Sequence, residues 1–243
     1  MPPVAGRTWF PASLDGRLVV LRRHAPENLA AFRRWYRDAE VARLARYQDG
    51  PMSIEEIDRF FQARAIGGES MTMAIHVRGS DRLVGTCAFS QLDADNGSAL
   101  YHITIGEKDA WGHGYGTEAT RLMVDHALGT LALHRVALSV FEFNERAIRA
   151  YAACGFSVEG RAREAIWRDG RWWDELSMSL LESDWRRQRT AGAGPGPGPE
   201  SESESRSGSG SGSGSGDAAS DDGDPLSVGG PARRAIAARI LGR

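Results

Sequence analysis

The sequence is poor in several residue types, and each shortage excludes a class of protein. Its 243 residues include only two cysteines, too few for a disulfide framework or a zinc site, so we expect no bound metal. No run of about 18 apolar residues is present, so no membrane-spanning helix is expected. Residues 1–7 lack the apolar segment of a signal peptide, and we therefore expect a cytoplasmic protein.

Positive charge is carried almost entirely by arginine, because Lys108 is the only lysine against 29 arginines. The formal net charge is nevertheless -2, and acidic residues interleave with the arginines along the chain. This pattern does not predict a broad basic surface for nucleic acid. We therefore expect neither nucleic acid nor a membrane as a partner.

Aromatic residues are absent from the end of the chain. All 20 lie between Trp9 and Trp185, whereas 28 of the last 53 residues are Gly, Pro or Ser. A segment that cannot bury apolar area cannot offset the entropy lost when its backbone is ordered. We therefore predict an N-terminal extension (1–15), one globular domain (16–187) and a disordered tail (188–243) with a short basic C-terminal segment.

Hydrophobic periodicity indicates alternating strands and helices. The pattern predicts strands at 17–22, 71–77, 83–90, 98–105, 135–141, 156–166 and 172–181, and helices at 26–37, 53–66, 117–128 and 144–154. Strands and helices mixed in this way are typical of an α/β or α+β sheet with helices on both faces.

A glycine-rich loop, Gly112-x-Gly114-x-Gly116, lies between a predicted strand and a predicted helix. Glycines let backbone N–H groups approach an anion, and the helix N-terminus adds about half a positive charge. The loop lacks the Gly-Lys-Ser/Thr of a nucleotide-binding P-loop and the spacing of a dinucleotide fingerprint. Taken alone, it fits a phosphate site or a tight turn equally well.

A second motif follows one strand later. Asn144, Ala147, Ile148 and Tyr151 have the spacing of one helix face, and Gly155 ends that helix. The face could be an ordinary core face. Its polar ends, Asn144 and Tyr151, could instead line a groove.

Together, Trp111-Gly-His-Gly-Tyr-Gly-Thr-Glu-Ala119 and Asn144…Tyr151…Gly155-Phe156 resemble the GNAT superfamily of acetyl-CoA-dependent N-acetyltransferases. The similarity is greatest to its RimJ/RimL branch, the ribosomal-protein N-terminal acetyltransferases and their relatives, and residues 163–175 resemble that branch too. The resemblance covers about residues 16–185. It implies a mixed, mostly antiparallel sheet of about seven strands with helices on both faces.

The resemblance implies a binding site for acetyl-CoA as co-substrate. The loop would receive the pyrophosphate, the strand before it would pair with the pantetheine amides, and Asn144 would contact the pantetheine arm. The implied acetyl-CoA contacts are Ile103, Thr104, Ile105, Trp111, Gly112, His113, Gly114, Tyr115, Gly116, Thr117, Asn144 and Ala147. Trp111 stands where the superfamily more often has Gln or Arg.

The resemblance also implies a catalytic acid at Tyr151, beside the CoA sulfur. A phenol remains protonated at neutral pH and can protonate the departing thiolate. The family's usual Glu base is replaced by Leu100. His102, on the same side of the strand, is the candidate base, with a structural histidine as the alternative. A protein α-amino group, with a pKa of about 7.7–8.0, needs little help from a base.

The expected function is transfer of acetyl from acetyl-CoA to a primary amine by direct attack in a ternary complex. The amine is either a protein N-terminus or a small molecule. Candidate acceptor-side residues are Tyr47, Trp173 and Asp174. The alternative is a non-catalytic acyl-CoA-binding regulatory module. Either a monomer or a homodimer is compatible with the sequence.

Overall fold

The computed structural model describes residues 11–45, 50–66 and 71–192. These residues belong to the first of two compact units, which spans Met1–Gly196. The second unit, with the basic C-terminal segment, lies outside the described residues. Within the described residues, the first element begins at Ser13 and the last ends at Gly192, whereas the predicted domain runs from 16 to 187.

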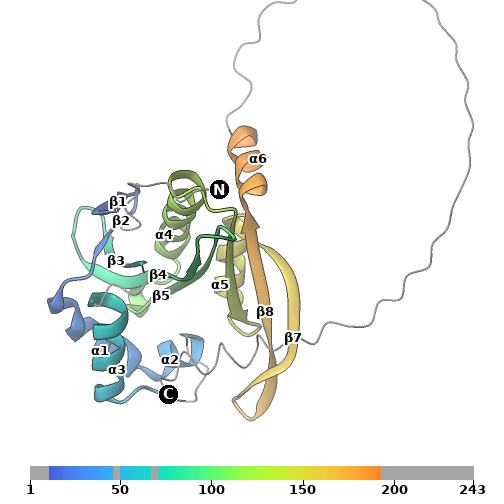
Figure 1. Ribbon diagram of the computed structural model, residues 1–243. Coiled ribbons are helices and arrows are strands. Elements are labelled where there is room, and N and C mark those ends of the chain that lie inside the picture. Colours follow the sequence, from blue (N-terminus) through green and yellow to red (C-terminus); the bar gives the residue numbers. More distant parts are fainter. Residues whose placement is uncertain (1–10, 46–49, 67–70, 193–243) are drawn as a thin grey trace, which may run out of the picture. The chain divides into compact units, whose positions relative to one another are not determined.

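An eight-stranded sheet organises the described unit, in the order β1-β2-β3-β4-β5-β6-β8-β7 (Figure 1). The strands are β1 Ser13–Asp15, β2 Val19–Arg23, β3 Met71–Val77, β4 Leu83–Asp93, β5 Ser98–Ile105, β6 Arg135–Phe141, β7 Ser157–Arg168 and β8 Arg171–Leu181. Neighbouring strands are antiparallel except β5 and β6, which run parallel. The mixed, mostly antiparallel sheet is therefore confirmed, with eight strands rather than about seven.

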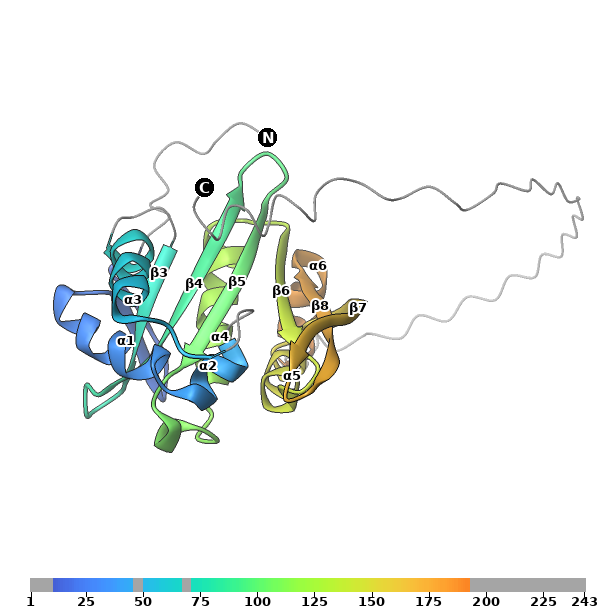
Figure 2. The ribbon, with the colours of Figure 1, turned by 90° about the horizontal axis from the view of Figure 1, so that it is seen from below.

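Helices cover both faces of this sheet. Figure 2 shows α1 (Leu29–Tyr36), α2 (Ala39–Ala45) and α3 (Ile54–Phe61) in front of the sheet and α4 (Tyr115–Val124) behind it. The remaining helical segments are η1 Pro26–Asn28, η2 Gln62–Ile66, η3 Lys108–Ala110, η4 Asp125–Thr130, α5 Glu145–Ala153 and α6 Glu182–Gly192. None of the described helices has the length and apolar character needed to cross a membrane.

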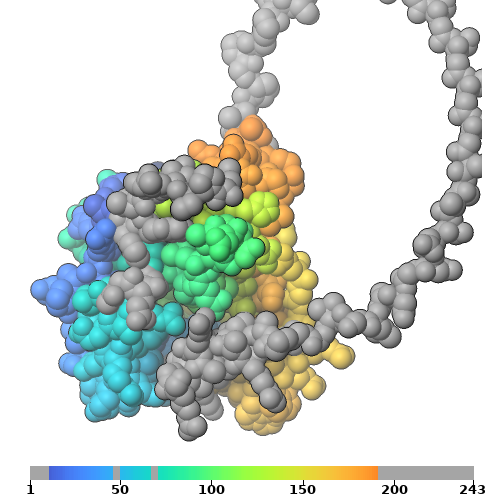
Figure 3. All heavy atoms as spheres, viewed as in Figure 1, coloured from blue at the N-terminus to red at the C-terminus, as the bar shows by residue number. Residues whose placement is uncertain are grey.

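Two apolar clusters fill the layers. The larger cluster packs the inner face of the sheet against α4, η4 and α5, and Met123, Tyr101 and Leu180 are among its fully buried members. The smaller cluster joins α1 and α3 through Phe32, Trp35 and other aromatic side chains. By contrast β7, an edge strand, is exposed along most of its length, as the yellow surface in Figure 3 shows.

Local signals fix where the helices begin. Ser53 and Glu56 form a capping box at α3, and Asn144 Oδ1 accepts a hydrogen bond from the Ala147 N–H at α5. The predicted helix 117–128 instead begins at Tyr115, after Gly114 in the left-handed conformation, and becomes π-helical from Asp125. Helices α2 and α6 and the three-residue strand β1 were not predicted; in α6, the contact of Trp185 with Asp125 spans 60 residues of sequence.

Candidate active site

Strands β5 and β6 form a pair over only part of their length. Their pairing runs from Ser98–Arg135 to Leu100–Ala137 and then stops. Beyond this point, among the described strands, the rest of β5 pairs with β4 alone and the rest of β6 pairs with β8 alone. Figure 2 shows the two strands separating toward their C-terminal ends. One edge of each strand therefore presents backbone groups that a ligand with amide groups could bind.

The glycine-rich loop closes the open end of this divergence. Gly112 and Gly114 have φ values of 82° and 81°, a region that disfavours residues with a Cβ. Gly114 directly precedes α4, whose first-turn N–H groups have no partner within the helix. This combination fits the pyrophosphate of CoA, because the backbone can approach the anion and the helix dipole favours it.

Three further loop residues lie around this helix end. The His113 ring stacks on Tyr115 with centroids 5.7 Å apart, and its Nδ1 lies 3.0 Å from the Trp111 carbonyl oxygen. Both rings line a hollow of about 310 Å³, which also contains the ion pair between Arg82 and Asp109. Thr117 is half-buried in the first turn of α4, next to Gly116.

The side chain of Trp111 is held at the end of β5 by contacts within the protein. Its indole Nε1–H donates a hydrogen bond of 2.7 Å to the Ile105 carbonyl, and its ring packs against the aromatic cluster of α1 and α3. The guanidinium of Arg146 lies 3.9 Å from the centre of the same ring. Trp111 therefore closes the end of β5 through its own side chain.

Asn144 and Ala147 lie where β6 leads into α5. Asn144 Oδ1 accepts a hydrogen bond of 3.2 Å from the Ala147 N–H, which fixes the orientation of the amide group. No described residue takes the Asn144 Nδ2 donor, so this group can serve a ligand. Ala147 itself packs against the larger apolar cluster.

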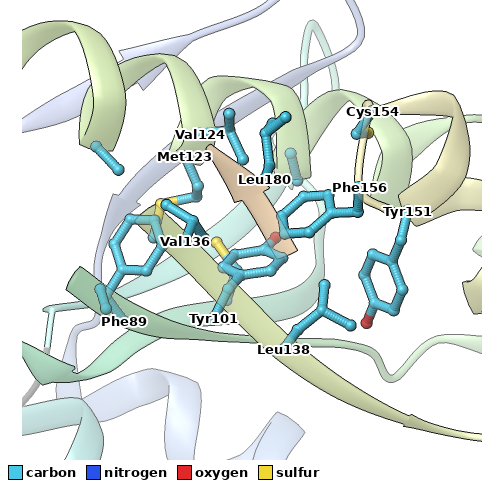
Figure 4. Close-up of a cluster of buried hydrophobic side chains, with 14 of the residues drawn as sticks. Phe89, Tyr101, Met123, Val124, Val136, Leu138, Tyr151, Cys154, Phe156 and Leu180 are labelled. Carbon is cyan, nitrogen blue, oxygen red and sulfur yellow. The ribbon is translucent and has the colours of Figure 1, made fainter. Parts of the chain in front are cut away.

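Tyr151 is buried in α5, with its ring edge-on to Phe156 at 6.0 Å. Figure 4 shows its hydroxyl beside Leu138. Leu138 is the first residue of β6 after the last β5–β6 pair, so the hydroxyl lies where the strands diverge. Burial raises the pKa of the Tyr151 phenol well above its ordinary value, with Cys154 as a lesser cause. The phenol therefore remains protonated throughout the neutral range.

His102 and Tyr101 lie on opposite faces of β5. The Tyr101 hydroxyl lies 3.1 Å from the Thr120 hydroxyl on α4, so Tyr101 faces α4 and His102 faces away from it. The imidazole is exposed, and its Nε2 is 2.7 Å from Ser90 Oγ. Desolvation by the surrounding protein and, secondly, the charge of Arg64 lower the pKa of His102 from 6.5 to about 4. The structure therefore places His102 and Tyr151 on opposite faces of the sheet, near the same end of the divergence.

The predicted acceptor-side residues are only partly available for a ligand. Asp174 binds Arg161 at 2.8 Å and the Glu164 N–H at 2.8 Å, and Arg161 lowers the pKa of its carboxyl group. Trp173 lies edge-on to Phe143 at 5.3 Å, with its Nε1–H bound to the Arg168 carbonyl. Tyr47 lies outside the described residues.

Two contacts near the site were not foreseen from the sequence. Arg43 of α2 lies 4.4 Å from the ring centre of Phe143 and binds Asp169 at 2.7 Å. The Arg146–Trp111 contact is the second. The only sequence signal was position, since Phe143 and Arg146 flank the motif residue Asn144.

Comparison with known proteins gives the family. The sequence pattern described as "Acetyltransferase (GNAT) domain" matches residues 18–157. The chain belongs to the GNAT acetyltransferase family. As a GNAT enzyme it is an acetyl-CoA-dependent N-acetyltransferase, with acetyl-CoA as co-substrate. This outcome favours an enzyme over a non-catalytic binding module.

Relatives and structures of other GNAT proteins agree with this assignment. The probable N-acetyltransferase YjcK of Bacillus subtilis is 34% identical over 127 residues, 51% of this chain and 68% of YjcK. The ribosomal protein uS5-alanine N-acetyltransferase of Escherichia coli is 30% identical over 105 residues, 42% of this chain and 53% of the relative. Spermidine N-acetyltransferase of Vibrio cholerae, solved with CoA and spermine, has the same fold. Its TM-score is 0.63 at 20% identity, over 70% of this chain and 99% of that chain.

Within the described residues, no group of three or more His, Cys, Asp or Glu side chains is arranged to hold a metal ion. The site consists instead of a backbone cradle, a buried phenol and an exposed imidazole.

Proposed function

We propose that this GNAT enzyme acetylates a primary amine by direct attack on acetyl-CoA in a ternary complex, with Tyr151 as the proton donor. The observation that carries this proposal is the Tyr151 hydroxyl beside Leu138, at the point where β5 and β6 separate (Figure 4). A thioester held between these strands would present its sulfur to that hydroxyl.

The chain offers a continuous series of groups for acetyl-CoA. First-turn N–H groups of α4 would hold the pyrophosphate, and backbone groups of Ile103 and Ile105 would pair with the pantetheine amides. The Asn144 Nδ2 donor would bind the pantetheine arm. These contacts hold the thioester carbonyl in place and so lower the entropy cost of the reaction.

In the reaction, the amine nitrogen attacks the thioester carbon, so that a C–N bond forms and the C–S bond breaks. The departing sulfur takes the proton of the Tyr151 hydroxyl, which keeps the leaving group neutral. Burial also raises the pKa of the neighbouring Cys154 thiol to about 11. A CoA sulfur in similar surroundings would be a better proton acceptor than in water.

The amine itself must lose a proton before or during attack. His102 on the other face of β5 is the proposed acceptor of that proton, directly or through a water molecule. Its lowered pKa keeps the imidazole neutral, and hence able to accept a proton, at neutral pH. In this arrangement the acceptor amine approaches from the face covered by α1, α2 and α3.

A polypeptide α-amino group is the acceptor that the site supports best, in agreement with the RimJ/RimL resemblance. Several carboxylates on the α2 side are already neutralised, since Asp38 binds Lys108 and Asp169 binds Arg43. Asp174, on the hairpin, binds Arg161. A polycation would need unpaired carboxylates, whereas a single α-amine does not. A polyamine is the second candidate, because a spermidine acetyltransferase has the same fold.

The acceptor class can be tested by release of free thiol from acetyl-CoA. The panel would contain peptides with free N-termini, the same peptides with blocked N-termini, and spermidine. We expect turnover with free N-termini and loss of turnover when they are blocked. Equal turnover with blocked and free peptides would contradict the α-amino proposal, and preference for spermidine would establish the second candidate.

A further inference from the structure

The two strands that enclose the proposed acetyl-CoA channel are joined at its open end by side chains rather than by backbone pairs. On the face of α4, the Cys154 thiol lies 3.4 Å from the Thr117 carbonyl, and Arg121 Nη2 donates to the Ala153 carbonyl at 3.0 Å. These contacts link α4 to α5. On the opposite face, which the acceptor would approach, the link is Arg146 over Trp111.

Both partners of this second link are held in place independently. Trp111 is fixed by its hydrogen bond to the Ile105 carbonyl and by packing against the aromatic cluster of α1 and α3. Arg146 is the second residue of α5, whose first turn is held by the Asn144 cap. The guanidinium therefore extends from the β6 side of the divergence to an indole on the β5 side.

Arg146 is otherwise exposed, yet partial burial lowers the pKa of its guanidinium, a shift opposed by the charge of Glu40 on α2. A cation over an indole is attracted by the ring quadrupole, and the attraction grows as water is excluded. The contact is thus a covering element whose outer side faces solvent. It is not a buried structural pair.

The position of this cover along the channel matters. Trp111 is attached at Ile105, while the Tyr151 hydroxyl lies at Leu138, opposite the start of the unpaired part of β5. Four residue steps separate Tyr101 from Ile105, which is about 13 Å along a strand. The cover therefore lies over the outer part of the channel and leaves the end near His102 open.

We propose that Arg146 is a positioning residue that closes the acceptor face of the pantetheine channel by stacking on Trp111. The proposal rests on the proposed acetyl-CoA site between β5 and β6. The closed cover retains the pantetheine arm, keeps water from the outer channel, and directs the acceptor amine toward His102. Arg146 contacts none of the reacting atoms.

Isothermal titration of the full chain with acetyl-CoA, without any acceptor, tests retention directly. We expect Arg146→Ala to raise the dissociation constant about threefold to tenfold, the range for one partly exposed cation–π contact. Arg146→Lys, which keeps the charge, should recover part of this loss. Arg149→Ala is the matched control. Arg149 lies on the same helix and is exposed in an ion pair with Glu145, and its loss should leave binding unchanged.

A second measurement separates closure from folding. We expect Arg146→Ala to increase CoA release by water, which yields acetate and free thiol, relative to acetyl transfer to an amine. Trp111→Leu should have the same effect. In the double variant, hydrolysis relative to acetyl transfer should be no greater than in either single variant. Because Trp111 also packs against α1 and α3, thermal unfolding of both variants is recorded alongside.

The possible outcomes distinguish this inference from the proposed function. If the wild-type chain binds no acetyl-CoA, the proposed site is wrong. If it binds acetyl-CoA and Arg146→Ala changes neither the dissociation constant nor the ratio of hydrolysis to transfer, the covering role is overturned. Additive effects of the Arg146 and Trp111 substitutions would equally contradict a shared contact.

Discussion

Glu118 and Leu18 are joined by a hydrogen bond of 2.5 Å from the Leu18 N–H to Glu118 Oε2, across 100 residues of sequence. The same carboxylate also accepts hydrogen bonds from the Arg17 N–H at 3.0 Å and the Val19 N–H at 2.8 Å. Gly16 lies so close that a Cβ there would approach Glu118 Oε2 to 2.6 Å. One side chain in the first turn of α4 therefore holds the start of β2.

We expect Glu118→Gln to reduce the free energy of unfolding by about 1–3 kcal/mol, because an amide cannot replace a carboxylate that accepts three backbone hydrogen bonds. Urea denaturation would measure the change. Glu145→Gln is the control, since Glu145 is exposed and its ion-pair partner among the described residues is Arg149 on its own helix. A midpoint shift no larger than that of the control would refute the importance of this carboxylate.

Tyr151→Phe should lower kcat about 100-fold or more, the usual contribution of a positioned general acid. The substitution removes the proposed proton donor and little volume, so the dissociation constant for acetyl-CoA should change little. Steady-state kinetics and calorimetric titration would report the two quantities separately. Unchanged kcat would remove Tyr151 from the proton transfer.

His102→Ala should change the pH dependence of kcat/KM. The proposed base works when neutral, and its pKa is lowered from 6.5 to about 4, so activity of the wild-type enzyme should persist below pH 6.5 and fall only as the pH approaches 4. That acid limb should disappear in His102→Ala, together with part of the activity. His134→Ala, at an exposed histidine directly before β6, should retain the limb. A pH profile identical for all three proteins would assign His102 a structural role.

His24 should make the fold sensitive to acid. Its Nε2 lies 2.9 Å from Thr86 Oγ1 and its ring lies edge-on to Phe32 at 5.1 Å, while burial lowers its pKa from 6.5 to about 4. The unfolded chain therefore takes up this proton at a higher pH than the folded chain. The stabilisation is complete above pH 6.5 and is lost as pH falls toward 4, by up to about 3 kcal/mol.

Urea denaturation at pH 7.5 and pH 5 would measure this effect. In His24→Gln, which cannot titrate, the difference in unfolding free energy between the two pH values should be smaller than in the wild-type chain. His134→Gln supplies the matched control. Equal pH dependence in the wild-type chain and His24→Gln would contradict the prediction.

Local signals in the sequence predicted much of the fold. The strand 98–105 was predicted with the bounds of β5, and the Asn144 cap and the glycine-rich loop were found where expected. Each depends on properties of a few adjacent residues, such as a positive φ or a side chain that caps a helix. The family motifs were recognisable for the same reason.

Contacts between distant residues could not be predicted. Arg43 reaches Asp169 across 126 residues, and nothing near Asp174 in sequence indicates that Arg161 neutralises it. Trp111 was expected to contact acetyl-CoA, and nothing in the sequence indicates that its indole N–H binds the Ile105 carbonyl. Such pairings depend on the order of the strands in the sheet and on the course of the β7–β8 hairpin. The spacing of residues along one sequence shows neither.

The short β5–β6 pairing also has a consequence for how the chain folds. Strands β1 to β5 are joined in sequence order by antiparallel pairs, and β6 to β8 form a second group. Only the parallel joint between the groups requires a crossover through α4. This joint has three residue pairs, whereas β4–β5 and β6–β8 have seven each, so it gains fewer backbone hydrogen bonds and the two groups should dock last. The amides that flank the joint would then gain protection from hydrogen exchange only when the catalytic centre itself is complete.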